Sequence, residues 1–141
     1  MTDDVVVRPY QSGDEPAVIE LWELCFPDDP PWHNPKDVIR RKLTVQPELF
    51  LVCLFEERLV GTVLAGYDGF RGWVNKVAAH PEVRRKGIAS RLMQAAEGGL
   101  TAIGCPKLNI QVRAENASVV DFYRNAGYTI EDRISMGKRL E

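Results

Sequence analysis

The stretch Val77-Ala-Ala-His-Pro-Glu-Val-Arg-Arg-Lys-Gly-Ile-Ala-Ser90 decides the fold, because a predicted strand runs through a turn into a predicted helix within it. The strand, Trp73 to Ala79, is an apolar and partly β-branched run that His80 and Pro81 stop. The helix, Ile88 to Ile103, carries apolar residues at a spacing that places them on one face. The chain therefore changes direction between two regular elements at this point.

The residues of this turn favour the binding of an anion. Backbone amides at a helix N-terminus converge on a negative charge, and the small residues Gly87 and Ala89 let a phosphate approach them. Arg84, Arg85 and Lys86 add positive charge beside the same turn. The glycine spacing fits neither the P-loop nor the GxGxxG dinucleotide loop. We therefore expect a pyrophosphate site of another type.

The remaining segments predict an alternation of strands and helices around this turn. Hairpins come first and one strand-helix-strand unit follows, so we expect a mixed sheet with antiparallel pairs and one parallel crossover. The further predicted strands are Val5 to Arg8, Leu49 to Phe55, Arg58 to Tyr67, Leu108 to Arg113, Tyr128 to Ile134 and Ser135 to Leu140. The further predicted helices are Glu15 to Phe26, capped by Ser12 or Asp14; Asn34 to Val45; and a helix from Asn116 or Ser118 to Gly127.

Length and composition indicate one domain over residues 1–141. The chain has 45% hydrophobic and 27% charged residues, which is ordinary for a globular protein. Three cysteines at wide spacing predict neither a disulfide framework nor a metal site. No segment resembles a signal peptide or a membrane span, so we expect a cytoplasmic protein without membrane contact. The net charge of −2 argues against a nucleic-acid partner. The helix that begins near Asn34 nevertheless has a predicted exposed face that is basic, with Lys36, Arg40, Arg41 and Lys42.

Charge is divided unevenly along the chain. Residues 1–70 hold 6 Lys and Arg against 13 Asp and Glu, whereas residues 71–141 hold 12 against 7. This division is typical of a protein with one face for a cationic partner and another for an anionic one, although unevenly distributed solvated charge fits the counts equally well.

A second motif lies downstream, in Asn116-Ala-Ser-Val-Val-Asp-Phe-Tyr-Arg-Asn-Ala-Gly-Tyr128. Together with Arg84, Gly87 and Ala89 of the turn, it resembles the GNAT superfamily of acetyl-CoA-dependent N-acetyltransferases, in particular the small bacterial YpeA-like type. Val119 stands where the family usually has alanine. The resemblance implies an α/β (α+β) fold in which a mixed, mostly antiparallel sheet of six to seven strands carries about four helices on both faces.

The resemblance also implies how acetyl-CoA is held as cosubstrate. The main chain of Val77, Ala78 and Ala79 would bind the pantetheine arm, with an amide near Ala78 polarising the thioester carbonyl. Asn116 would meet the same arm through its side-chain amide, and it can also cap the last helix. The residues that would hold the phosphates are Arg84, Arg85, Lys86, Gly87, Ile88, Ala89 and Ser90.

Tyr123 matches the position of the family's general acid, where a phenol protonates the departing thiolate. The general base is open. Many family members place a glutamate on the strand that here reads Trp-Val-Asn-Lys-Val, and this chain has Asn75 and Lys76 instead. We favour Asp68 as the base; Glu115 and a water relay are the alternatives.

The region of Trp22 and Trp32, with Glu23, Asp28 and Asp29, is interpreted as a lid over the acceptor, since its carboxylates suit a cationic amine. The alternative is a solvated loop without such a role. We expect the protein to transfer acetyl to a primary amine of a small molecule, peptide or protein N-terminus. The amine would attack directly in a ternary complex. The alternative is a non-catalytic, regulatory acyl-CoA-binding module. Either a monomer or a homodimer is compatible with the sequence.

Overall fold

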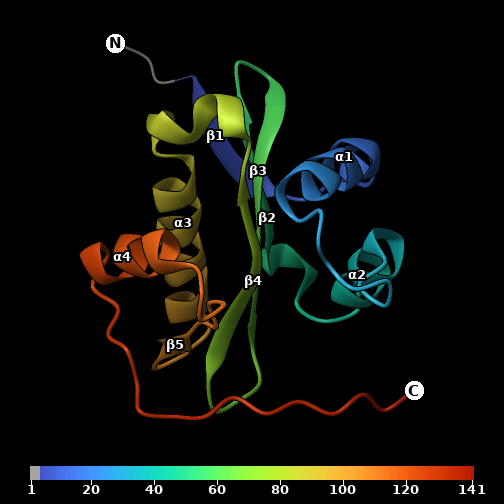
Figure 1. The fold of residues 1–141 in the computed structure, drawn as a ribbon. Helices are drawn as coiled ribbons and strands as arrows, with labels where there is room; N and C mark the ends of the chain where they lie inside the picture. Colours follow the sequence, from blue (N-terminus) through green and yellow to red (C-terminus); the bar gives the residue numbers. More distant parts are fainter. Residues whose placement is uncertain (1–3) are drawn as a thin grey trace. The chain divides into compact units, whose positions relative to one another are not determined.

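The computed structural model describes residues 4–141 and divides them into two compact units. The first unit extends to Ile110, and the second comprises Gln111–Glu141. All the strands of the described chain lie in the first unit, together with helices α1, α2 and α3, while α4 lies in the second (Figure 1). The single domain expected over residues 1–141 therefore stays a prediction.

Five strands form one sheet, in which their order is the order of the chain. The first four strands pair antiparallel, and the last pair, β4 with β5, is parallel. This arrangement confirms the expected mixed sheet with one parallel crossover. The strands are β1 (Val5–Pro9), β2 (Phe50–Phe55), β3 (Arg58–Tyr67), β4 (Gly72–Ala79) and β5 (Leu108–Asn109).

Helices cover both faces of the sheet in the first unit. Helices α1 and α2 lie against one face, and α3 lies against the other (Figure 1). The α-helices are α1 (Glu15–Cys25), α2 (Pro35–Lys42), α3 (Ile88–Ala102) and α4 (Ala117–Asn125). Three short 3₁₀ helices precede α1, β2 and α3: η1 (Ser12–Asp14), η2 (Pro47–Leu49) and η3 (Pro81–Lys86).

The N-termini of α1 and α2 can be compared with the caps predicted for them. Asn34 caps α2 as expected, because its Oδ1 accepts hydrogen bonds from the amides of Lys36 and Asp37 at 3.0 and 3.3 Å. Asp14 occupies the N-cap of α1, but its side chain does not cap that helix. Its carboxylate instead accepts two hydrogen bonds from the Arg8 guanidinium, and this contact lowers the pKa of Asp14. Asp14 therefore holds the expected N-cap position of α1, but the side-chain hydrogen bond of a cap is not formed.

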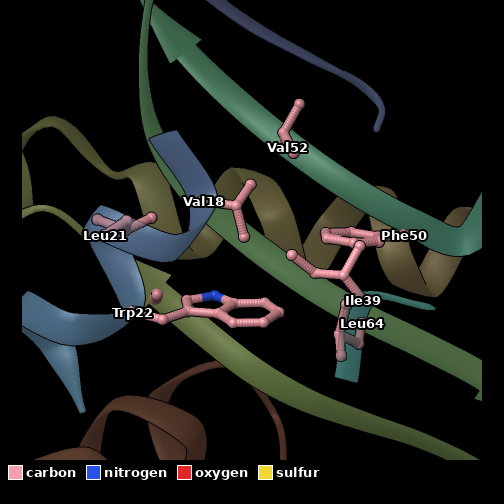
Figure 2. Close-up of a cluster of buried hydrophobic side chains, with 8 residues drawn as sticks. Val18, Leu21, Trp22, Ile39, Phe50, Val52 and Leu64 are labelled. Carbon is pink, nitrogen blue, oxygen red and sulfur yellow. The ribbon is translucent and has the colours of Figure 1, made fainter. Parts of the chain in front are cut away.

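The core between the sheet and helices α1 and α2 is a cluster of buried apolar side chains (Figure 2). The Trp22 indole stacks on Phe50 with ring centroids 6.2 Å apart, and Tyr10 stacks on the same ring at 4.5 Å. This packing fixes α1 on the sheet. The cluster comprises Val18, Leu21, Trp22, Ile39, Phe50, Val52, Leu64 and Ala78.

Two predicted surface or strand features are wrong. Lys42 does not belong to an exposed basic face of α2, because its Nζ turns inward and donates to the carbonyls of Ala65 and Val45. The sheet has five strands among the described residues rather than six or seven, since residues 128–141 form no strand. Alternating apolar residues predict a strand there, yet Ile134, Met136 and Leu140 are about nine-tenths exposed. A strand needs a hydrogen-bonded neighbour, and alternation alone does not provide one.

Candidate active site

The turn between β4 and α3 has the geometry of a helix start shaped by one glycine. β4 ends at Ala79, and Nδ1 of His80 then accepts a hydrogen bond from the amide of Glu82 at 3.1 Å, which caps η3. Gly87 follows with a φ of 73°, a left-handed conformation that favours glycine, and α3 begins at the next residue. Gly87 thus serves as both the end of η3 and the N-cap of α3.

The N-terminus of α3 is suited to an anion. Gly87 has no side chain that could cap the first amides of the helix, and no acidic residue lies in its first turn. The side chains of Arg84, Arg85 and Lys86 are exposed directly before it. A pyrophosphate binds well to uncapped backbone amides with cations nearby, and the N-terminus of this fifteen-residue helix offers both. The structure therefore brings together the predicted phosphate-binding residues 84–90.

β4 has an unpaired edge next to this turn. Its parallel pairing with β5 covers only Gly72 with Leu108 and Trp73 with Asn109. Within the first unit, residues 74–79 of β4 have no strand partner on that side, although they continue beside β3. Backbone groups of an unpaired edge are available to an extended ligand. The predicted pantetheine-binding residues, Val77 to Ala79, lie in this unpaired stretch.

A bulge interrupts β4 within that stretch, just before Val77. The pairing of β3 with β4 shifts register between Thr62 and Leu64, and Lys76 on the opposite strand has a φ of 52°. A left-handed conformation at a residue other than glycine costs about 1–3 kcal/mol, and active sites are among the places where such residues cluster. The carbonyl of Lys76 accepts a hydrogen bond from the Thr62 hydroxyl, which accepts one from Nε1 of Trp22, both at 2.8 Å. Helix α1 is thereby connected through β3 to the bulge.

The cysteines of the described chain are free. Burial raises the pKa of the Cys25 thiol, with the Arg84 guanidinium opposing this effect, and Cys25 donates to the Ala79 carbonyl at 3.5 Å. Burial also raises the pKa of Cys53 to about 11. Such protonated thiols are poor nucleophiles. Their environment agrees with direct attack by an acceptor rather than an acyl-cysteine intermediate.

Tyr123 and Asn116 belong to the second unit. Tyr123 is 6% exposed and meets the rings of Phe122 and Tyr128 edge to face, at 5.0 and 5.6 Å between centroids. Burial raises the pKa of Tyr123 to about 12, which keeps the phenol protonated and makes it a weaker acid than an exposed tyrosine. Asn116 occupies the N-cap of α4 without a side-chain cap bond; its Oδ1 accepts instead from the Ser118 hydroxyl at 3.5 Å. Asn116 therefore holds the expected N-cap position of α4, but the side-chain hydrogen bond of a cap is not formed.

The two carboxylate candidates for the base, Asp68 and Glu115, belong to different units of the chain. Asp68 lies in the turn between β3 and β4, where its Oδ1 accepts from the amides of Phe70 and Arg71 at 2.8 Å. These two hydrogen bonds, of which the one from the Arg71 amide has the larger effect, hold the pKa of the exposed Asp68 carboxyl below its ordinary value. Asp68 therefore has a clear structural role, and its role as a base stays a prediction. Glu115 is exposed in the second unit and is equally untested.

The residues of the predicted lid differ in burial: some belong to the core and others lie at the surface. Trp22 is buried in the apolar cluster at 2% exposure and is not a lid residue, whereas Trp32 is half exposed. Asp29 is the lid carboxylate that reaches the sheet, where it forms an ion pair with Lys76 of the bulge. This pair was not predicted from the sequence. The one signal for it was the charged residue Lys76 within a largely apolar strand.

Candidate sites of two other kinds are absent from the described residues. No helix between residues 4 and 141 is both long and apolar enough to cross a membrane. No group of three or more His, Cys, Asp or Glu side chains in the same residues is arranged to hold a metal ion.

Comparison with known proteins identifies the class of enzyme. The model of the acetyltransferase (GNAT) family matches residues 15–128, a span that contains both motifs. An acetyltransferase of Yersinia enterocolitica is 44% identical over 134 residues, which cover 95% of this chain and 94% of that protein. An acetyltransferase of Pectobacterium atrosepticum is 42% identical over the same shares. The chain is an acetyltransferase, and it belongs to the GNAT family.

Solved structures share this fold at low sequence identity. An aminoglycoside N-acetyltransferase in complex with CoA has a TM-score of 0.81 at 14% identity, covering 99% of this chain and 97% of that one. Ard1 from Thermoplasma volcanium has a TM-score of 0.80 at 20% identity, covering 91% and 84%. The ribosomal-protein-S18-alanine N-acetyltransferase of Escherichia coli has a TM-score of 0.73 at 18% identity, covering 87% and 76%. At such identities the likeness establishes the fold alone.

Proposed function

We propose that this acetyltransferase moves the acetyl group of acetyl-CoA to a primary amine, with both substrates bound together. The observation that carries the proposal is the uncapped N-terminus of α3, which follows the unpaired edge of β4 with only η3 between them. The helix start suits the pyrophosphate, and the edge suits the amide-containing pantetheine arm. These two subsites are adjacent in the chain, as one extended cosubstrate requires.

The reaction that we propose is aminolysis of a thioester. The neutral amine nitrogen forms a bond to the acetyl carbonyl carbon, and the carbon–sulfur bond then breaks. The amine loses one proton to a base, and the thiolate of CoA gains one. A backbone amide near Ala78 would stabilise the negative charge on the carbonyl oxygen, a contribution that is typically worth about 3–4 kcal/mol in acyl transfer.

Tyr123 is the group that we propose protonates the thiolate. Its phenol holds a proton at neutral pH, as tyrosine does at its ordinary pKa of about 10, and burial raises the pKa of Tyr123 to about 12, which makes it a weaker acid. Its position in the second motif is therefore what supports the role. The proton from the amine would pass to Asp68, to Glu115 or through water. Free, protonated cysteines support transfer without a covalent enzyme intermediate.

The acceptor belongs to one of two chemical classes in our proposal. Among the solved neighbours, one is titled an aminoglycoside N-acetyltransferase and another a ribosomal-protein-S18-alanine N-acetyltransferase. A small cationic amine and a protein N-terminus are therefore the acceptors to compare. The carboxylates of Asp28 and Asp29 support a cationic acceptor, although Asp29 already pairs with Lys76.

Release of the CoA thiol tests this function. Purified protein is incubated with acetyl-CoA and a panel of aminoglycosides, polyamines, amino acids and N-terminal peptides, and free thiol and acetylated product are measured together. We expect product with at least one class, at a rate that saturates with both substrates. Binding of acetyl-CoA without turnover across the panel would favour the regulatory module instead.

Location and assembly are part of the same proposal. Free cysteines, with Cys53 fully buried, support a reducing compartment such as the cytoplasm. We propose a monomer or a homodimer, which sedimentation at two protein concentrations distinguishes.

A further inference from the structure

The bulge residue Lys76 combines an unfavourable backbone conformation with a mostly buried charge. Its φ of 52° suits glycine or asparagine better than lysine, and its side chain is 13% exposed. The Lys76 side chain makes interactions that glycine or asparagine could not make at this position. Its Nζ pairs with the Asp29 carboxylate and lies 4.6 and 5.4 Å from the ring centroids of Phe26 and Trp22.

Asp29, the partner of Lys76 in this ion pair, lies in the segment between α1 and α2. Hydrogen bonds within that region, from the amide of Asp29 to Phe26 and from that of His33 to Pro30, give it local turns. His33 also faces Asp29, with Nδ1 3.7 Å from Oδ2. The ion pair with Lys76 joins the segment to the sheet across forty-seven positions of sequence.

The pair completes a closed path of contacts around the bulge. Trp22 of α1 donates to Thr62 of β3, Thr62 donates to the Lys76 carbonyl, and the Lys76 side chain returns to Asp29, which follows α1. Backbone and side chain of Lys76 are thus held from two directions. Ala78, beside which the thioester carbonyl lies in the proposed function, is two residues further along β4.

We propose that the ion pair of Lys76 and Asp29, here called the latch, holds residues 27–34 against the β4 bulge. By fixing this segment, the latch positions the surface that the acceptor amine contacts. Lys76 and Asp29 are both positioning residues: neither is required to touch the reacting atoms. The effect on the acceptor rests on the proposed function, whereas the attachment of residues 27–34 does not.

Hydrogen exchange of peptides that cover residues 27–34 tests the latch without turnover. In Lys76→Met and Asp29→Asn we expect exchange there to be about tenfold faster, the size typical of a coupled, partly buried pair. Asp28→Asn is the matched control, because Asp28 is the adjacent carboxylate and is exposed. Equal exchange in Asp28→Asn and Asp29→Asn would overturn the proposal.

Two further variants separate the latch from damage to the fold. Lys76→Gly accepts the left-handed φ, so we expect the bulge to persist while exchange in residues 27–34 increases as in Lys76→Met. The double variant Lys76→Met with Asp29→Asn should exchange no faster than either single variant, since one interaction is lost in all three. Additive effects would contradict a shared contact.

Kinetics then connect the latch to the acceptor. We expect the KM of the acceptor to rise about tenfold in Lys76→Met and Asp29→Asn, while kcat and the KM of acetyl-CoA stay within about twofold. A fall in kcat with unchanged acceptor KM would overturn the positioning role. If the unmodified protein acetylates no amine, the proposed function fails, and the exchange comparison still decides whether the latch exists.

Discussion

A Cβ atom added at Gly61 would lie 2.7 Å from Cγ2 of Ile88, so β3 and the first residue of α3 meet without room for a side chain. The same atom would lie 2.8 Å from Leu92 and 3.0 Å from the carbonyl of Ala78. The glycine on β3 thereby fixes two features of the site at once: the start of the proposed pyrophosphate helix and the β4 strand beside it.

Gly61→Ala should lower the free energy of unfolding by about 1–3 kcal/mol, because the methyl group overpacks a closed contact. The shift of α3 should also weaken the binding of CoA. Urea unfolding and calorimetric titration with CoA measure the two effects. Gly98→Ala is the control, since a Cβ atom added there would meet nothing within 4 Å and alanine favours the helix. A neutral Gly61→Ala would contradict the close packing.

Gly87→Ala should lower the affinity for CoA with only a modest loss of stability. The Cβ meets nothing within 4 Å, so the expected cost of about 1–2 kcal/mol comes from the φ of 73°. Relief of that strain would turn the first amides of α3 away from the pyrophosphate. Gly104→Ala is matched to it, because Gly104 follows the opposite end of α3 with a φ of 87° and equal space. Equal losses of CoA affinity in both variants would contradict the assigned site.

Thr62→Val should lower the free energy of unfolding by about 1–3 kcal/mol, because it leaves the buried Trp22 N–H without its acceptor. The Lys76 carbonyl loses its donor in the same variant. Thr62→Ser keeps the hydroxyl and should cost less. Urea unfolding, followed by tryptophan fluorescence, ranks the two variants, and a greater loss in Thr62→Ser would show that the methyl group matters more than the hydroxyl.

The order of elements was predictable from sequence, because local signals define each element. The stop at His80 and Pro81, the Asn34 cap and the glycine before Ile88 all act within a few residues, and the structure has each at its predicted place. The bulge at Lys76 was not predictable, because it depends on Thr62 and Trp22, which are distant in sequence. The same holds for the C-terminal alternation around Ile134, whose local pattern does not specify a pairing partner.

Tyr123→Phe should lower kcat about 10²–10⁴-fold while the affinity for acetyl-CoA stays unchanged, since the ring remains and the proton donor is lost. Steady-state kinetics and a separate binding titration measure the two quantities. Tyr10→Phe is the control in the first unit, because Tyr10 also packs on an aromatic ring but lies outside the proposed site. Equal turnover in Tyr123→Phe and the parent would remove Tyr123 as the acid.

The raised pKa of Tyr123 also predicts a loss of stability in alkali. The unfolded chain releases the phenolic proton near pH 10, whereas the folded protein retains it until about pH 12. The contribution of this group is therefore complete below pH 10 and is lost as pH rises toward 12, by about 2–3 kcal/mol in total. Urea unfolding at pH 9, 10 and 11 compares the parent with Tyr123→Phe. Groups such as Cys53 titrate in both proteins and cancel, so the free energy of unfolding of the parent should fall relative to that of Tyr123→Phe as pH rises. A difference that stays constant up to pH 11 would mean that Tyr123 is not buried as the structure has it.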